Sequence, residues 1–228
     1  MTRAVVLLSG GLDSTVTLAH ALSQGDEVLP LTIYYGQRHD KELLAAKDVA
    51  SYYNLKKHIM MKLDLSCFSS SALTSMMVEV PERDSVEAIK DEIPVTYVPA
   101  RNIIFLSIAA GLCECESASR VYIGANAVDY SGYPDCRPEF FWQYQKVLEV
   151  GTKTGVEGKP IQIITPIIGK TKGEIVAMGK ELGAPLHLTW SCYKGGRKAC
   201  GQCDSCLLRL KGFKEAGYQD PIEYEGRI

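Results

Sequence analysis

Four cysteines near the C-terminal end of the chain have the spacing of a metal site. The stretch "SCYKGGRKACGQCDSC" places Cys192, Cys200, Cys203 and Cys206 within fifteen residues. Four thiolates complete a closed tetrahedral Zn²⁺ site at Zn–S distances of ~2.3 Å, and closed sites are structural. We therefore expect these residues to bind zinc and to hold the end of the chain in place.

An iron–sulfur cluster is the alternative at these cysteines. The C-x2-C-x2-C spacing also opens a ferredoxin-type run, but "LLRL" follows Cys206 in place of the C-x3-C-P continuation. The spacing favours zinc and leaves the cluster open. The other four of the eight cysteines lack paired spacing and are expected to be small core residues, with a catalytic role for Cys136 as the less favoured reading: Cys67, Cys113, Cys115 and Cys136.

A second candidate for chemistry is the loop "SGGLDS", Ser9 to Ser14, which follows the apolar run Ala4 to Leu8. Glycines allow the backbone to approach a ligand closely, and a helix that begins here offers free N–H groups to an anion. The loop contains no lysine, and it matches neither the Walker A pattern nor the dinucleotide fingerprint. A later "GKT", Gly169 to Thr171, lacks the upstream glycine because Ile164 stands there.

Polar groups also gather in a later loop, Gly124 to Phe141, "GANAVDYSGYPDCRPEFF". It follows a predicted strand, and such a density of polar and aromatic side chains at the carboxyl edge of a parallel sheet indicates a flat, hydrogen-bonding ligand. Arg101 and Asn102 begin a predicted helix and add a guanidinium beside another anion-favouring terminus. The alternative for residues 124–141 is an ordinary polar loop, and the alternative for Arg101 is a solvated side chain that caps the helix.

These segments must be positioned by alternating strands and helices. Apolar runs and helical periodicity predict an α/β fold with a doubly wound, mainly parallel sheet. The predicted strands are Ala4–Leu8, Val28–Tyr34, His58–Leu63, Val121–Ile123 and Ile161–Ile164. The predicted helices are Asp13–Ser23, Asp40–Tyr53, Asn102–Glu116, Pro138–Val150, one opened by a capping box at Thr171 and Glu174, and a last one that contains Cys206.

The chain divides into two unequal parts in this reading. Residues 1–185 form the α/β domain, with an excursion from the sheet at 66–94, and residues 186–228 form a cysteine-rich tail with the last helix. With 228 residues, 46% hydrophobic, and a formal net charge of −2, the composition is that of one globular core. It disfavours a membrane span and nucleic acid as a partner, and the start of the chain lacks a signal-peptide pattern, so we expect a cytoplasmic protein.

The loop resembles the S-G-G-x-D-S signature of the N-type ATP pyrophosphatase superfamily, whose members have the adenine nucleotide alpha hydrolase-like fold and cleave ATP between its α and β phosphates. The resemblance implies ATP with Mg²⁺ as the ligand. It implies catalytic roles for Ser9, Asp13, Ser14 and Arg101. The ATP-binding residues would be Leu8, Ser9, Gly10, Gly11, Leu12, Asp13, Ser14 and Thr15.

From "SGGLDS" through "VPARN" and "DYSGYPDCRPEF" to the cysteines, essentially the whole chain resembles the 7-cyano-7-deazaguanine synthase family. The resemblance implies that 7-carboxy-7-deazaguanine, ammonia and two ATP give the nitrile, two AMP and two pyrophosphates, in a homodimer. It implies zinc at the four cysteines. As a hypothesis, Asn126, Asp129, Asp135 and Arg137 bind the deazaguanine.

Two other functions stay open at this point. A tRNA-thiolating enzyme of the same superfamily would favour a basic surface, an RNA-binding domain and a catalytic persulfide cysteine. The net charge of −2 argues against the surface, and the predicted domains leave no room for an RNA-binding one. A protein that only binds ATP would not need the second polar loop. The chain leaves no room for a glutaminase unit, so free ammonia is the expected nitrogen donor.

Overall fold

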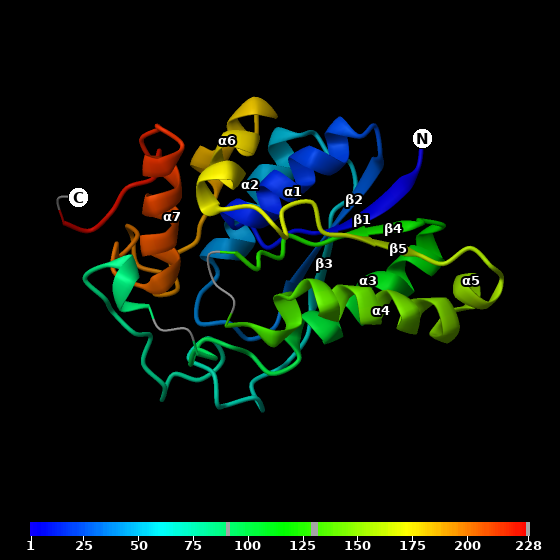
Figure 1. Ribbon diagram of the computed structural model, residues 1–228, viewed down its shortest axis with the longest axis horizontal. Coiled ribbons are helices and arrows are strands. Elements are labelled where there is room, and N and C mark those ends of the chain that lie inside the picture. The colour runs from blue at the N-terminus through cyan, green and yellow to red at the C-terminus, as the bar shows by residue number, and fades with distance from the viewer. Residues whose placement is uncertain (90–91, 129–131, 227–228) are drawn as a thin grey trace.

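The computed structural model describes residues 1–89, 92–128 and 132–226. A sheet of five parallel strands runs through the described part, in the order β3-β2-β1-β4-β5. This confirms the predicted α/β fold with a parallel sheet (Figure 1). The strands are β1 (Arg3–Leu7), β2 (Glu27–Tyr34), β3 (Ile59–Lys62), β4 (Arg120–Tyr122) and β5 (Gln162–Ile164).

Helices cover both faces of the sheet, as in a doubly wound fold (Figure 1). On one side lie α1 (Leu12–Ser23), α2 (Lys41–Tyr52) and α6 (Lys172–Glu181). On the other lie α3 (Arg101–Glu116), α4 (Pro138–Gly151) and the short α5 (Lys153–Val156), while α7 (Asp204–Glu215) packs beside α6. Three short 3₁₀ turns are formed by Val86–Ala88, Pro134–Cys136 and Leu186–Leu188.

The strands are buried on both faces, which explains their continuous apolar sequences. Val5 and Leu7 of β1 pack in the cluster that includes residues of α3 and α4, whereas Ala4 and Val6 pack in the cluster that includes α1 and α2. Successive side chains of a strand point to opposite faces, so a strand covered twice must be apolar at every position.

The predicted helices and strands are present, with ends that differ by at most two residues. The predicted capping box is confirmed: the Thr171 hydroxyl accepts a hydrogen bond from the Glu174 N–H at 3.2 Å, and the Glu174 carboxylate accepts one from the Thr171 N–H at 2.7 Å. The sequence did not predict α5, whose single turn contains Gly155 and lacks a long periodic pattern.

The strand order brings two distant loops together. The chain leaves β1 through α1 toward β2 on one face and later enters β4 through α3 on the other face, so the direction of winding changes between β1 and β4. Ligands of such sheets bind at this switch point, outside the carboxyl ends of the strands. A Cβ on Gly124, after β4, would lie 2.9 Å from the Asp13 carbonyl carbon, so only glycine allows this approach to α1.

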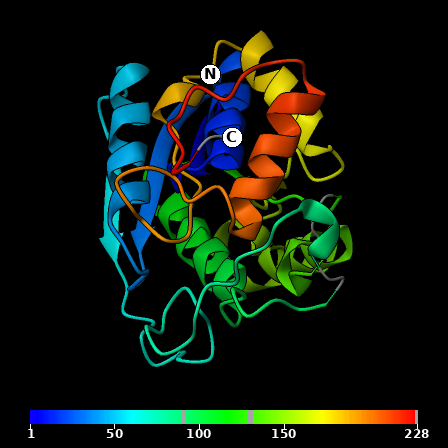
Figure 2. The same cartoon turned by 90° about the vertical axis from the view of Figure 1, so that its left-hand side faces the viewer.

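Residues 66–89 of the excursion and the described part of the C-terminal tail pack against one another (Figure 2). Ala72 and Val80 share an apolar cluster with the cysteines, and the Arg83 guanidinium donates to the Asp204 carboxylate at 2.7 Å at the start of α7. The division at residue 185 stays a prediction. In the described residues, every helix is too short or too polar to cross a membrane.

Candidate active site and metal centre

A cavity of about 300 Å³ opens at the carboxyl edge of the sheet, at the switch point between β1 and β4. Its wall is built from the loops after β1, β2 and β4, the first turns of α2, α3 and α6, and the cysteine-rich tail. The two polar loops singled out in the sequence therefore meet at one site, together with Arg101.

The loop after β1 is held in shape by its own side chains. The hydroxyls of Ser9 and Ser14 lie 3.0 Å apart, the Ser14 hydroxyl accepts from the Ser9 N–H at 3.2 Å, and the Ser9 hydroxyl accepts from the Gly11 N–H at 3.3 Å. Gly10 has φ of +86°, a conformation that favours glycine. Gly11 gives α1 no side-chain cap. Because the first N–H groups of a helix lack intrahelical partners, this end of α1 suits an anion.

Most of the residues predicted to bind ATP line the cavity. The lining residues are Leu8, Ser9, Gly11, Leu12, Asp13 and Ser14. The other two lie behind the loop: Gly10 packs against the backbone of α2, and the buried Thr15 hydroxyl has no hydrogen-bond partner in the described residues.

A lysine that is far away in the sequence forms an ion pair with the loop. The Lys172 ammonium lies 2.8 Å and 2.9 Å from the two carboxylate oxygens of Asp13, and both residues line the cavity. Lys172 is the first residue of α6 and directly follows the "GKT" that fails as a Walker motif. The sequence analysis missed it, because 159 residues separate it from Asp13 and only the fold joins them.

Another part of the cavity wall is aromatic and cationic. The Arg101 guanidinium carbon lies 5.9 Å from the centre of the Tyr35 ring, and the rings of Tyr35 and Phe105 lie 5.5 Å apart. Burial acts to lower the pKa of Arg101, but Tyr35 and Tyr133 outweigh it and the pKa is raised, so the guanidinium is fully charged. This part of the wall offers flat surfaces and one positive charge.

Asp135, predicted to bind the substrate, contacts the start of α3. Its carboxylate accepts from the Asn102 N–H at 3.0 Å, and its main-chain oxygen accepts from the Asn102 side-chain amide at 3.0 Å. Ala100, the residue before α3, has φ of +55° and supplies no side-chain cap, so Asp135 caps this helix from another loop. Asp135 is buried, and its neighbours Asn102 and Cys136 line the cavity.

The other predicted substrate residues lie in different places. Asn126 lines the cavity, and its amide donates to the Ile167 carbonyl at 3.3 Å. Arg137 is exposed at the start of α4, outside the cavity wall. Asp129 falls outside the residues that the structure describes. The roles of all of them stay predictions.

Glu42, in the first turn of α2, is a cavity residue that the sequence analysis missed. Removal from water raises the pKa of its carboxyl to about 7, against the lowering effect of Arg101. A signal was present in the sequence: "YGQRHDKE" follows the carboxyl end of a predicted strand, as the loop after Ile123 does. Polar residues at that edge belong to the same crevice.

Cys136 lines the cavity as a neutral thiol. Burial raises its pKa to about 11, and its sulfur accepts a hydrogen bond from the Asn102 amide at 3.2 Å. A thiolate is the nucleophilic form of cysteine, so this environment disfavours covalent catalysis near neutral pH.

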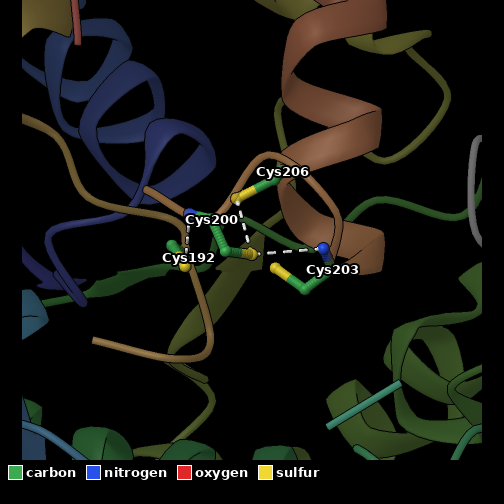
Figure 3. Close-up of side chains that lie close together, drawn as sticks. All are labelled: Cys192, Cys200, Cys203 and Cys206. Atoms are coloured by element: carbon green, nitrogen blue, oxygen red, sulfur yellow. Dashed lines mark hydrogen bonds between the residues drawn. The ribbon is translucent and has the colours of Figure 1, made fainter. Parts of the chain in front are cut away.

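The four predicted metal ligands form one compact cluster (Figure 3). Their sulfurs all lie within 4.8 Å of one another, and all four residues are buried: Cys192, Cys200, Cys203 and Cys206. Backbone N–H groups support the sulfurs, with Cys200 donating to Cys192 at 3.4 Å and Cys203 donating to Cys200 at 3.3 Å. At Zn–S distances of ~2.3 Å, tetrahedral sulfurs lie about 4 Å apart, so this cage fits one ion better than a multi-iron core.

Comparison with known proteins identifies relatives over the whole chain. Residues 3–217 match the family described as "Queuosine biosynthesis protein QueC". A protein of Acetivibrio thermocellus named 7-cyano-7-deazaguanine synthase is 58% identical over 227 residues, which cover 100% of both chains. One of the same name from Picrophilus torridus is 57% identical, covering 99% of this chain and 92% of the relative.

Solved structures share the fold at lower identity. A 4-thiouridine synthetase in an RNA complex with bound ATP aligns with a TM-score of 0.50 and 24% identity, covering 80% of this chain and 41% of that one. NMN synthetase from Francisella tularensis aligns with a TM-score of 0.50 and 14% identity, covering 96% of this chain and 78% of that one. These similarities support the predicted adenine nucleotide alpha hydrolase-like fold and carry no argument about substrate.

Proposed function

Because the chain belongs to the queuosine biosynthesis protein QueC family, we propose that it converts 7-carboxy-7-deazaguanine and ammonia to 7-cyano-7-deazaguanine with two molecules of ATP. The observation that carries the proposal is the single cavity that joins an anion-binding loop to an aromatic and cationic wall. An enzyme that adenylates an aromatic acid needs these two surfaces side by side.

The loop Ser9 to Ser14 would hold the phosphates of ATP, with Mg²⁺ as counter-ion. Attack of the substrate carboxylate on the α phosphorus breaks the bond to the β-phosphate oxygen and develops negative charge on the departing pyrophosphate. The N–H groups of the loop, the Ser9 and Ser14 hydroxyls and the Lys172 ammonium are the groups placed to stabilise that charge. Asp13 orients the lysine through their ion pair.

Two rounds of adenylation lead from acid to nitrile. In the first round, ammonia attacks the acyl carbon of the mixed anhydride, and AMP leaves to give the primary amide. In the second round, the amide oxygen attacks ATP and releases pyrophosphate, and loss of two N–H protons and AMP gives the nitrile. Both rounds activate an oxygen on the same carbon, so one phosphate site serves both.

The cysteine cluster would hold Zn²⁺ as a structural ion. Four buried thiols fill a closed coordination sphere and leave no position for substrate, so the ion would fix the tail rather than activate water. The tail contributes Trp190, Ser191 and Tyr193 to the cavity wall, so the metal would support the site indirectly. The homodimer and the cytoplasmic location expected from the sequence stay predictions.

The tRNA-thiolating alternative is not favoured. Its catalytic thiol would have to be a reactive cysteine, yet the cysteine in the cavity, Cys136, has a pKa raised to about 11. The relatives that match the full chain at 58% and 57% identity are named 7-cyano-7-deazaguanine synthase.

The test is product analysis with purified protein, ATP, Mg²⁺, ammonium chloride and 7-carboxy-7-deazaguanine, with one component omitted in each control. We expect two AMP for each nitrile and no turnover without the deazaguanine. Replacing ammonium with glutamine should stop the reaction. ADP as the product, or AMP formation indifferent to the deazaguanine, would contradict the proposal.

A further inference from the structure

One cavity carboxylate has no part in phosphate chemistry. Among the described residues, Asp13 and Glu42 are the carboxylates that line the cavity. Asp13 is paired with Lys172 at 2.8 Å. The Glu42 carboxylate accepts no hydrogen bond from the described residues, although its side chain is only partly exposed. Because Glu42 lines the cavity, a ligand bound there can supply the donors that its carboxylate lacks.

The fold fixes Glu42 beside the phosphate loop. Gly10 lies so close to α2 that a Cβ on it would overlap the main-chain oxygen of Glu42. The first turn of α2 therefore cannot move away from the loop without breaking this packing. Arg101 also lines the cavity and is close enough for its charge to act on Glu42, and Tyr35 and Phe105 line the cavity beside Arg101. A flat ligand between these groups would meet a carboxylate, a guanidinium and aromatic faces.

The chemistry of the proposed substrate matches this arrangement. The aminopyrimidinone ring of a deazaguanine has two N–H donors on one edge, the ring N1–H and the exocyclic 2-amino group. A carboxylate has two coplanar acceptor oxygens and can accept from both donors at once. The 7-carboxylate is on the other ring of the bicycle and needs a cation, which Arg101 supplies.

We propose that Glu42 binds the aminopyrimidinone edge of the deazaguanine and so determines the specificity of the site for that base. This inference rests on the proposed function. Asp135, the carboxylate first predicted for this role, instead caps α3 through the Asn102 N–H at 3.0 Å and lies outside the cavity wall. Glu42 lines the cavity and its carboxylate accepts no hydrogen bond from the described residues, whereas Asp135 stabilises the helix that presents Arg101.

The experiment compares two substrates, 7-carboxy-7-deazaguanine and its analogue without the 2-amino group. Wild type should prefer the parent acid by about 10- to 100-fold in kcat/KM, the range for one hydrogen bond to a charged group. Glu42→Gln should lower kcat/KM for the parent acid and reduce its preference over the analogue to within about 3-fold. The NH2 group of the Gln side chain is itself a donor, so it cannot accept a hydrogen bond from the 2-amino group. The KM for ATP should stay within about 3-fold of wild type, because Gly10 packs on the main chain of Glu42, which the substitution leaves unchanged.

Two variants control the comparison. Asp48→Asn makes the same change at an exposed position of α2 and should keep the wild-type preference. Glu42→Asp keeps the carboxylate and should keep a preference for the 2-amino group with a raised KM. Circular dichroism and bound metal per chain show whether each variant is folded.

Each outcome decides the assignment. A Glu42→Gln enzyme that keeps the wild-type preference, or that loses both substrates equally, overturns it while the nitrile synthase activity of wild type stands. A wild-type enzyme indifferent to the 2-amino group overturns it without any variant, should Glu42→Gln fail to fold. If wild type makes no nitrile from the parent acid, the proposed function itself fails, and the assignment fails with it.

Discussion

The loop Ser9 to Ser14, which we propose to bind phosphate, and the cysteine cluster both lie near the carboxyl edge of the sheet but owe their shapes to different causes. The loop is held by hydrogen bonds between its own serines and by packing of Gly10 on α2, so it is formed before any ligand arrives. The cluster brings four buried sulfurs within 4.8 Å of one another, supported by N–H donors and by an apolar cluster that includes Ala72 and Val80. We therefore expect the loop to keep its shape without a ligand, and the cluster to depend on the proposed Zn²⁺.

The largest expected effect is that of removing the proposed Zn²⁺, which should destabilise the cysteine cluster and leave the loop Ser9 to Ser14 unchanged. After chelation, or in Cys206→Ser, amides of residues 192–215 should exchange hydrogen at least about 100-fold faster, because structural Zn²⁺ contributes ~10 kcal/mol or more to its site. Amides of β1 and α1 should keep their protection. Hydrogen exchange with mass spectrometry measures both regions in one experiment.

Cys115→Ser is the control, since this thiol is exposed and outside the cluster. Equal loss of protection in both regions would show that the loop depends on the metal too, and the contrast between them would be lost.

A methyl group on Gly10 should damage the loop directly. Gly10→Ala adds a Cβ that overlaps the backbone of Glu42 and Ala46, at φ of +86°. We expect a loss of about 3 kcal/mol or more in the free energy of unfolding, as for an overpacked core position with a strained backbone. Urea unfolding followed by circular dichroism measures it.

Gly25→Ala provides the matched comparison. Gly25 has a similar φ of +74°, but a Cβ there has no neighbour within 4 Å. It should cost only about 1–2 kcal/mol, the penalty of the left-handed conformation itself. Equal losses for the two variants would mean that the contact with α2 does not hold the loop.

The smallest expected effect is at Cys136. Cys136→Ser should keep kcat within about 3-fold of wild type, because burial raises the pKa of this thiol to about 11 and leaves it protonated at pH 7 to 8. For the same reason iodoacetamide at pH 8 should label exposed Cys67 and Cys115 first. A loss of more than about 100-fold in kcat would show a catalytic thiol.

The features of the fold and the site that the sequence predicts are those formed by residues close together in the chain. The cysteine cluster and the loop Ser9 to Ser14 are local patterns of fifteen and six residues, so the cysteine spacing indicates a metal site and the loop can be matched to a known signature. The strands and helices follow from apolar periodicity, because a strand buried on both faces must be apolar throughout. These features need only neighbouring residues.

The rest of the site depends on distant contacts. Lys172 pairs with Asp13 across 159 residues, and Glu42 lines the cavity in a helix that packs on Gly10. Asp135 lies in a polar loop that looks like a binding site, but its carboxylate is directed to the first turn of α3. Composition shows that a loop is polar and leaves open which way each side chain points.

Arg209 shows what the last residues of the chain contribute. Its guanidinium is almost fully buried on α7, and it donates to Asp220 at 2.7 Å and 3.0 Å and to the Thr189 hydroxyl at 2.7 Å. A shortened chain that ended before Asp220 would strand this positive charge in the interior, which typically costs 3–5 kcal/mol. Proteolysis that removes Asp220 would therefore lower the free energy of unfolding, whereas a purification tag added after Glu225 would leave the Arg209–Asp220 ion pair intact.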